Sequence, residues 1–93
     1  PVDYALQQNY PNPFNPTTNI PFSLEKTDET TLTIYNMLGQ QIKTLVNRKM
    51  SAGSHEMRWD GLDDYGLPVS AGIYIYQLKS GDFKETKQLT LVR

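Results

Sequence analysis

Residues 9–16 constrain the fold of this chain more than any other segment. They place three prolines and three asparagines around two aromatic rings: Asn9, Tyr10, Pro11, Asn12, Pro13, Phe14, Asn15 and Pro16. Each proline fixes its own φ near about −65° and keeps the preceding residue out of the helical region, so the segment cannot be a helix. A flexible linker favours Gly and Ser, whereas these two rings are large enough to anchor the segment on a folded body. We therefore expect residues 9–17 to form a shaped, docked loop, called here the proline loop.

Length and composition predict one small domain, residues 1–93. A chain of 93 residues buries only about 60–65% of its surface on folding, and no cysteine is present to supplement a thin core with disulfides. The formal net charge of −1 gives no electrostatic reason to expect nucleic acid or an anionic membrane as a partner. No apolar run reaches the roughly 20 residues of a transmembrane helix. Because the sequence begins at Pro1 without an initiator Met, we interpret it as a piece of a longer protein, in which any export signal would lie upstream.

Alternation of apolar and polar side chains recurs along the chain, which is the pattern of half-buried β-strands. Pro21 cannot donate a ladder hydrogen bond, so we expect its strand at a sheet edge or that position facing outward. Ile42, Leu45 and Val46 do not alternate cleanly, which predicts a bulge or an early bend, with a short helical turn as an alternative. The expected strands are residues 19–24, 30–35, 41–46, 55–59, 72–79 and 83–92, with a possible seventh at 4–8.

These short strands, separated by glycine turns and without a helix, predict an all-β fold. The best match is an immunoglobulin-like antiparallel β-sandwich of about seven strands that lacks the disulfide of antibody domains. Residues 72–79 carry apolar side chains on both faces, so we expect a central strand there. Ser80, Gly81 and Asp82 predict a tight hairpin turn into the last strand, residues 83–92, whose apolar face includes Phe83 and Leu89.

Little in the sequence indicates catalysis. His55 is the only imidazole, and Ser51 and Ser54 are close to it in sequence, but no nucleophile-elbow glycine pattern surrounds either serine. A partly buried strand histidine explains the residue better. There is also no phosphate loop and no set of paired Cys and His ligands. We therefore expect a protein that is not an enzyme.

Three carboxylates cluster between the fifth and sixth expected strands: Asp60, Asp63 and Asp64. A flexible loop rich in oxygen ligands suits a calcium ion, although the spacing lacks the bidentate Glu that closes a helix-flanked calcium loop. The same density of Asp and Gly describes an ordinary structural turn, in which Asp accepts hydrogen bonds from its own backbone. The turn is the preferred interpretation, no cofactor is expected, and calcium stays as the alternative.

Four segments, taken together and in order, resemble the C-terminal sorting domains of the type IX (Por) secretion system. Residues 6–18 resemble the opening of those domains and residues 34–42 resemble their second motif. Ala71, Gly72, Ile73 and Tyr74 resemble their Gly-x-Tyr strand, and residues 87–93 resemble their basic and aliphatic chain end. Residues 59–69 together with Gly72, Ile73 and Tyr74 resemble more closely the immunoglobulin-like domain of the flagellar hook-capping protein, a related family.

The sorting-domain resemblance implies a β-sandwich attached to a larger secreted or cell-surface protein of a Gram-negative bacterium of the Bacteroidetes type, exported via the periplasm. It implies recognition by the outer-membrane secretion translocon, then cleavage by a surface sortase, with the upstream cargo domain in the same chain. Carried over by position, the recognition residues are Gly72, Tyr74, Lys87, Leu89, Leu91, Val92 and Arg93. A terminal edge strand is a natural template for pairing with another protein's sheet, which makes strand addition a physical route to recognition.

Two other functions fit the same sequence. Six tyrosines and one tryptophan could line a carbohydrate-binding face, although most of them lie among apolar neighbours and are better explained as core. The chain would then be a binding or spacer module of a secreted hydrolase. The hook-capping resemblance instead implies a structural assembly domain.

Overall fold

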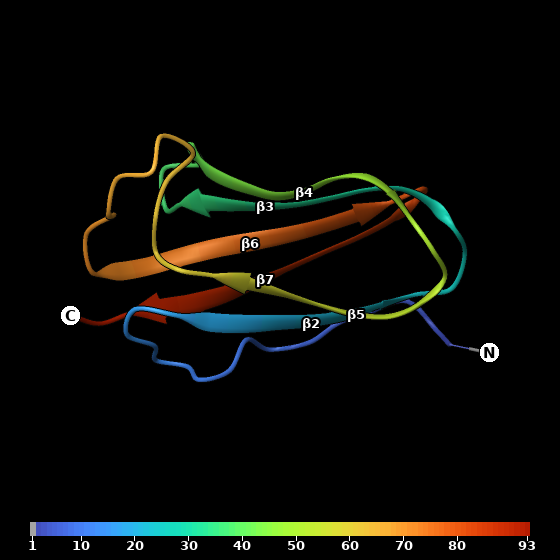
Figure 1. The fold of residues 1–93 in the computed structure, drawn as a ribbon, viewed down its shortest axis with the longest axis horizontal. Helices are drawn as coiled ribbons and strands as arrows, with labels where there is room; N and C mark the ends of the chain where they lie inside the picture. The colour runs from blue at the N-terminus through green and yellow to red at the C-terminus, as the bar shows by residue number, and fades with distance from the viewer. Residues whose placement is uncertain (1) are drawn as a thin grey trace.

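The computed structural model describes residues 2–93, which form two antiparallel β-sheets packed face to face (Figure 1). One sheet has the strand order β1-β2-β5, and the other has the order β4-β3-β6-β7. The seven strands are β1 (Ala5–Leu6), β2 (Thr18–Leu24), β3 (Asp28–Asn36), β4 (Gln41–Met50), β5 (Gly53–Trp59), β6 (Gly72–Ser80) and β7 (Phe83–Leu91). The predicted fold class is confirmed, and β6 lies between β3 and β7 as expected for a central strand. Among residues 2–93, no helix is long and apolar enough to cross a membrane.

The core lies between the sheets because alternate side chains of each strand point inward. In β6, for example, Tyr76 and Leu78 are fully buried while Gln77 between them is only partly buried. The loop residue Phe14 joins this core with 1% of its surface exposed. The buried apolar side chains are Leu6, Phe14, Ile20, Phe22, Leu24, Leu32, Ile34, Val46, Met50, Trp59, Tyr74, Tyr76, Leu78, Leu89 and Leu91.

Strand β4 is irregular at the positions where the sequence lost its alternation. Its pairing with β3 shifts register between Leu32 and Thr33 and again between Ile34 and Tyr35. The shifts leave Leu45 and Ile42 as extra residues without a direct partner on β3. The bulge expectation is therefore confirmed, and the alternative of a helical turn is wrong.

Pro21 lies in β2, which has neighbours on both sides, so the edge-strand alternative is wrong. The other alternative is confirmed, because Pro21 is partly exposed between the buried Ile20 and Phe22 and so faces outward. The register continues β1 so that Gln7 faces Pro21, and the Gln7 N–H donates to the Pro21 carbonyl at 3.0 Å. The reciprocal bond, from residue 21 to the Gln7 carbonyl, cannot form because proline has no N–H. The proline is tolerated because its nitrogen points toward this short segment and away from the ladder with β5.

The Tyr76 hydroxyl, from the opposite sheet, supplies the donor that Pro21 lacks. It donates to the Gln7 carbonyl at 2.7 Å and accepts the Asn9 N–H at 2.9 Å. Among residues 2–93, every buried side-chain nitrogen and oxygen has a hydrogen-bond partner. The Tyr76 side chain thus joins the two sheets and fixes the backbone where the proline loop begins.

Replacing Tyr76 with Phe should lower the free energy of unfolding by about 1–3 kcal/mol, because the Gln7 carbonyl and the Asn9 N–H lose their partner in a water-poor site. Urea unfolding followed by circular dichroism measures the change. Tyr35→Phe is the matched control, since no hydrogen bond of the Tyr35 hydroxyl is found within the described residues. Equal stability of the Tyr76→Phe variant and the wild type would show that the hydroxyl does not hold the segment.

The same hydroxyl predicts a loss of stability in alkali. Burial raises the pKa of Tyr76 from 10.0 to about 12, so the folded state favours the neutral phenol. This contribution to stability is fully present below pH 10.0 and is lost as the pH rises through about 12. Urea unfolding of the wild type across that interval should show a decline that is smaller in Tyr76→Phe. Parallel curves for the two proteins would refute this assignment.

Candidate recognition edge

Strand β7 is an edge strand, paired along its length with β6 alone. Its hairpin register, with Ser80 facing Phe83, turns the main-chain groups of even-numbered residues away from β6. The Thr90 carbonyl accepts the Phe14 N–H at 3.0 Å, and the Val92 N–H donates to the Phe14 carbonyl at 2.9 Å. The proline loop therefore adds a short parallel bridge to the outer edge of β7.

Two side chains extend this cover. Asn12 Oδ1 accepts the Thr90 N–H at 3.1 Å, and Gln8 Nε2 donates to the Gln88 carbonyl at 2.7 Å. The last strand is an edge strand, as expected, but only part of its outer edge is open for strand addition. The part that ends the chain is covered by the proline loop, and the open part lies between Lys84 and Gln88.

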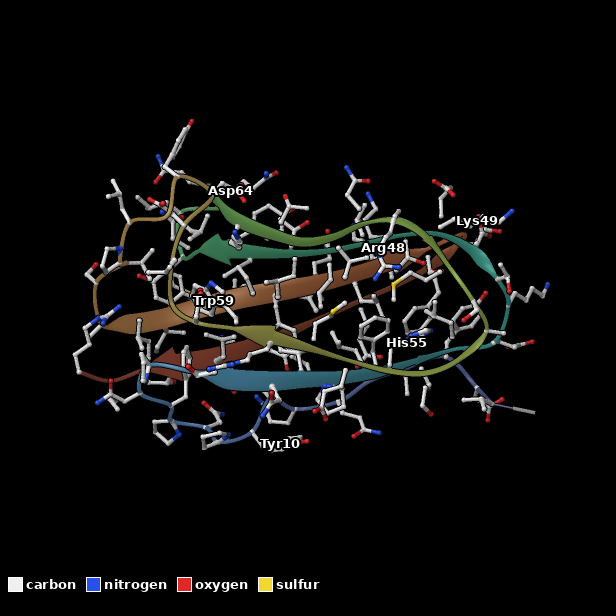
Figure 2. The ribbon with its side chains drawn as sticks, in the orientation of Figure 1. Tyr10, Arg48, Lys49, His55, Trp59 and Asp64 are labelled. Carbon is white, nitrogen blue, oxygen red and sulfur yellow. The ribbon has the colours of Figure 1, made fainter. Side chains whose placement is uncertain are left out.

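Aromatic packing holds the proline loop in place. The Phe14 ring lies 5.6 Å from the ring of Trp59, which meets Tyr74 edge-on at a further 5.6 Å. Trp59 is fully buried and its Nε1 donates to the Leu62 carbonyl at 2.9 Å. Figure 2 shows Trp59 between the two sheets, near the end of the sandwich where the C-terminus emerges. Three segments far apart in the sequence thus meet at one indole.

The remaining loop residues divide into one buried anchor and an exposed rim. Asn9 is 2% exposed, and its Nδ2 donates to Thr18 Oγ1 at 3.0 Å and to the Pro11 carbonyl at 3.3 Å. Tyr10 lies on the outer surface (Figure 2), where its hydroxyl donates to Glu56 at 2.5 Å and this bond raises the pKa of Tyr10. The other rim residues are Pro11, Asn12, Pro13, Asn15 and Pro16.

The structure gathers most of the predicted recognition residues at one end of the sandwich, leaves Lys87 in the middle of β7, and buries several of them. Gly72 faces Leu91, and Tyr74 faces Leu89, across the ladder between β6 and β7. The Tyr74 hydroxyl donates to the Ser70 carbonyl at 2.6 Å. Their exposure falls into three groups: buried Tyr74, Leu89 and Leu91; partly exposed Gly72 and Lys87; exposed Val92 and Arg93.

The end of the chain is exposed yet fixed. Arg93 Nε donates to the Val69 carbonyl at 3.0 Å, which ties the last residue to the loop between β5 and β6. Gly61 of that loop has φ +76, and a Cβ there would lie 3.2 Å from the Pro16 carbonyl. The proline loop, the loop of residues 60–71 and the chain end are therefore in contact with one another.

Two features of this region were missed in the sequence. Glu85 and Lys87 occupy the inner face of β7 together with Phe83 and Leu89, where they form an ion pair of 3.5 Å. Glu85 and Lys87 follow Phe83 and precede Leu89 at intervals of two residues. This spacing could have predicted charged side chains on the inner face of an edge strand. The second feature is apolar exposure in the loops at this end: Leu38 is 86% exposed and Tyr65 is 90% exposed.

The carboxylates of Asp60, Asp63 and Asp64 accept hydrogen bonds from main-chain N–H groups. Asp63 Oδ1 accepts the N–H groups of Tyr65 and Leu67, each at 2.9 Å. Asp60 Oδ1 accepts the Leu62 N–H at 3.2 Å. Asp64 Oδ1 accepts the Thr44 N–H at 3.0 Å, while its own N–H donates to the Ile42 carbonyl, so the loop is fastened to the edge of β4 (Figure 2). Within residues 2–93, no three His, Cys, Asp or Glu side chains gather in a way that could hold a metal ion.

The histidine does not meet a serine hydroxyl. His55 Nε2 bonds to the main-chain carbonyl of Ser51 at 2.7 Å, and its ring lies 5.4 Å from that of Phe22. A shallow cavity of about 260 Å³ opens elsewhere, lined by Lys43, Leu45, Arg58 and Asp60. Neither arrangement places a nucleophile beside a base.

Two facing antiparallel sheets without a cysteine, closed at one end by a docked loop, define an immunoglobulin-like β-sandwich domain. The family described as the FlgD Ig-like domain matches residues 12–82 of this sequence. The chain therefore belongs to the FlgD Ig-like domain family. This confirms the resemblance to the immunoglobulin-like domain of the hook-capping protein.

Solved structures share the fold at low sequence identity. Dimeric latent PorU from Porphyromonas gingivalis superposes with a TM-score of 0.73 at 18% identity, covering 94% of this chain and 9% of PorU. PorZ of the same organism gives 0.65 at 17% identity, covering 92% of this chain and 11% of PorZ. FlgD from P. aeruginosa gives 0.63 at 21% identity, covering 80% of this chain and 58% of FlgD.

This chain thus spans about a tenth of the length of PorU and PorZ. No curated protein sequence matches it.

Treatment with EDTA should leave the melting temperature unchanged, because one carboxylate oxygen of each Asp already accepts main-chain N–H groups and the three carboxylates do not gather as a metal site within the described residues. Asp63→Ala should lower the free energy of unfolding by about 1 kcal/mol, whereas Asp63→Asn keeps an acceptor oxygen and should cost less. Thermal unfolding measures the effect of EDTA, and urea unfolding measures the effect of the two Asp63 variants. A melting temperature that falls with EDTA and returns with Ca²⁺ would restore the calcium alternative.

Proposed function

We propose that this chain is a non-enzymatic C-terminal sorting domain, which directs a larger protein across the outer membrane to the cell surface through a type IX secretion system. The observation that carries the proposal is that segments far apart in the sequence, each resembling a sorting motif, lie together in the fold. The segments that resemble sorting motifs, namely the proline loop, Gly72 with Tyr74, and the last part of residues 87–93, meet at the end of the sandwich where Val92 and Arg93 are exposed.

Two of the solved structures that share the fold support a link to type IX secretion. PorZ is described as an essential bacterial surface component of the type-IX secretion system, and a tenth of its length has the fold of this chain. PorU shares the fold over a similar share of its own length. The proposal extends their context to this chain, with an upstream cargo domain, a translocon that reads the sandwich, and a surface sortase that acts after export.

The exposed groups indicate what a translocon would contact. Leu89 and Leu91 are in the core, so a receptor for the folded domain reaches Val92, Arg93 and the rim of the proline loop instead. The ordering of this end by the Arg93 bond to Val69 lowers the entropy cost of recognition. We therefore assign the receptor contact to the chain end and the loop that covers β7.

A structural assembly domain is the second candidate, because the matching family is that of FlgD. In this case the exposed apolar tips, Leu38 and Tyr65, would pack against neighbouring subunits. A carbohydrate platform has less support, since the well-exposed rings of the described chain, Tyr10 and Tyr65, come from separate loops.

A periplasmic reporter carrying this chain at its C-terminus should reach the surface of a bacterium that has a type IX system. Removing only Val92 and Arg93 should trap the reporter in the periplasm, because both side chains are exposed. The deletion removes their hydrogen bonds to Phe14 and Val69 but no core side chain. Removing residues 89–93 instead would also delete two buried leucines and unfold the domain. Surface proteolysis and cell fractionation measure the outcome.

The matched control replaces Glu25 and Lys26 with Ala, an equally exposed pair on the turn between β2 and β3. This variant should be exported normally. Undiminished display after removal of Val92 and Arg93 would contradict the assigned contact, and a full-length fusion that stays in the periplasm would overturn the sorting role.

A further inference from the structure

The outer edge of β7 is half covered and half open. The proline loop and Gln8 bond the outward groups from the Gln88 carbonyl onward, namely that carbonyl, the N–H and C=O of Thr90 and the N–H of Val92. Within residues 2–93, the outward N–H and C=O groups of Lys84 and Thr86 have no hydrogen-bond partner. An unpaired row of this kind is a template for another strand.

Two opposite charges flank the centre of this open stretch. Glu85 and Lys87 lie on either side of Thr86 on the inner face of β7, with side-chain exposures of 38% and 33%. They are 3.5 Å apart within the chain. A strand that added here would meet one negative and one positive side chain on that face, in a fixed order.

We propose that this stretch pairs with the same stretch of a second copy of the chain, antiparallel, with the two-fold axis at Thr86. This register places Glu85 opposite Lys87 of the second copy and Lys87 opposite Glu85 of the second copy. Lys84 then faces Gln88, and Thr86 faces Thr86. Opposite charges directly across an antiparallel ladder stabilise it, and a two-fold interface uses the same surface on both copies.

The hydrogen bonds fit the same register. Thr86 exchanges both of its outward bonds with its copy, and Lys84 exchanges with Gln88. The Gln88 carbonyl already accepts Gln8 Nε2, but a carbonyl oxygen has a second lone pair for the N–H of Lys84. The pairing joins the two four-stranded sheets into one continuous sheet.

Other registers of this strand are unfavourable. An axis at Lys84, Glu85 or Lys87 would place each of those side chains against its own copy, and like charges directly opposite destabilise a ladder. An axis at Gln88 would set Thr86 against Thr90. The outward groups of Thr90 are already bonded to Asn12 and Phe14. Thr86 is therefore the centre that charge and hydrogen bonding both allow.

The opposite edges of the two sheets are less suited to self-pairing. On β5 the even-numbered residues face away from β2, and the central one is Glu56, which would oppose its own copy. On β4 two bulges interrupt the edge, and Asp64 bonds both Ile42 and Thr44.

Sedimentation of the purified chain over a range of concentrations tests the proposal. The wild type should show a reversible monomer–dimer equilibrium that weakens with salt. Glu85→Lys and Lys87→Glu should each weaken the dimer by roughly tenfold or more, because each puts like charges opposite twice. The double variant, Glu85→Lys with Lys87→Glu, should restore it.

Mixing the two single variants gives the sharpest measurement. One copy then carries two positive charges and the other two negative charges, so the proposed register pairs them in a heterodimer although neither forms a dimer alone. Lys79→Glu, an exposed reversal on β6, is the control and should leave dimerisation unchanged. Circular dichroism confirms that each variant is folded.

A wild type that is monomeric at every concentration, or singles that do not associate when mixed, would overturn the proposal. A dimer that persists in both single variants, Glu85→Lys and Lys87→Glu, would also overturn it, because the second copy would then pair in another register or at another surface. The inference goes beyond the sorting role and is independent of it. Sedimentation of the isolated chain can succeed while the export experiment fails, and the reverse also holds.

Discussion

The contact on which the arrangement of this domain most depends is that of the Tyr76 hydroxyl with the backbone of Gln7 and Asn9. Pro21 leaves the ladder between β1 and β2 one donor short, and the missing donor comes from the other sheet. The bond orders the backbone at Asn9, whose side chain then fixes the first turn of the proline loop through Thr18 and Pro11. A single phenol thus couples the pairing of the sheets to the shape of the loop.

The loop in turn decides which part of β7 is accessible. Phe14 reaches Trp59 in the core, and its main chain is thereby held against Thr90 and Val92. The loop ends its cover near Gln88, where the open stretch begins. Both proposed interactions of this domain follow from that division: the covered end presents the exposed and ordered residues Val92 and Arg93, and the open stretch presents unpaired backbone with alternating charge.

Strand positions were predictable because they depend on local alternation, and even the bulges of β4 were visible where Ile42 and Leu45 broke the pattern. The place of β2 in its sheet was not. It depends on the Tyr76 hydroxyl, which lies 67 residues from Asn9 along the chain. The cover on β7 was missed for the same reason, since Asn12 and Thr90 are 78 residues apart. The candidate site was located by resemblance, and its partition into buried and exposed residues required the packing.

That partition bears on how a sorting signal of this kind can be read. Tyr74, Leu89 and Leu91 are recognisable as sequence but are inaccessible once the sandwich has folded. Core packing explains their presence in a motif, because all three belong to the same buried core cluster as Phe14 and Trp59. If the proposed sorting role holds, a receptor that meets the folded domain contacts the surface that these residues support and not the residues themselves. Under the proposed sorting role, substitutions of the buried motif residues would act on recognition through stability, whereas substitutions of the exposed Val92 and Arg93 side chains would act through contact.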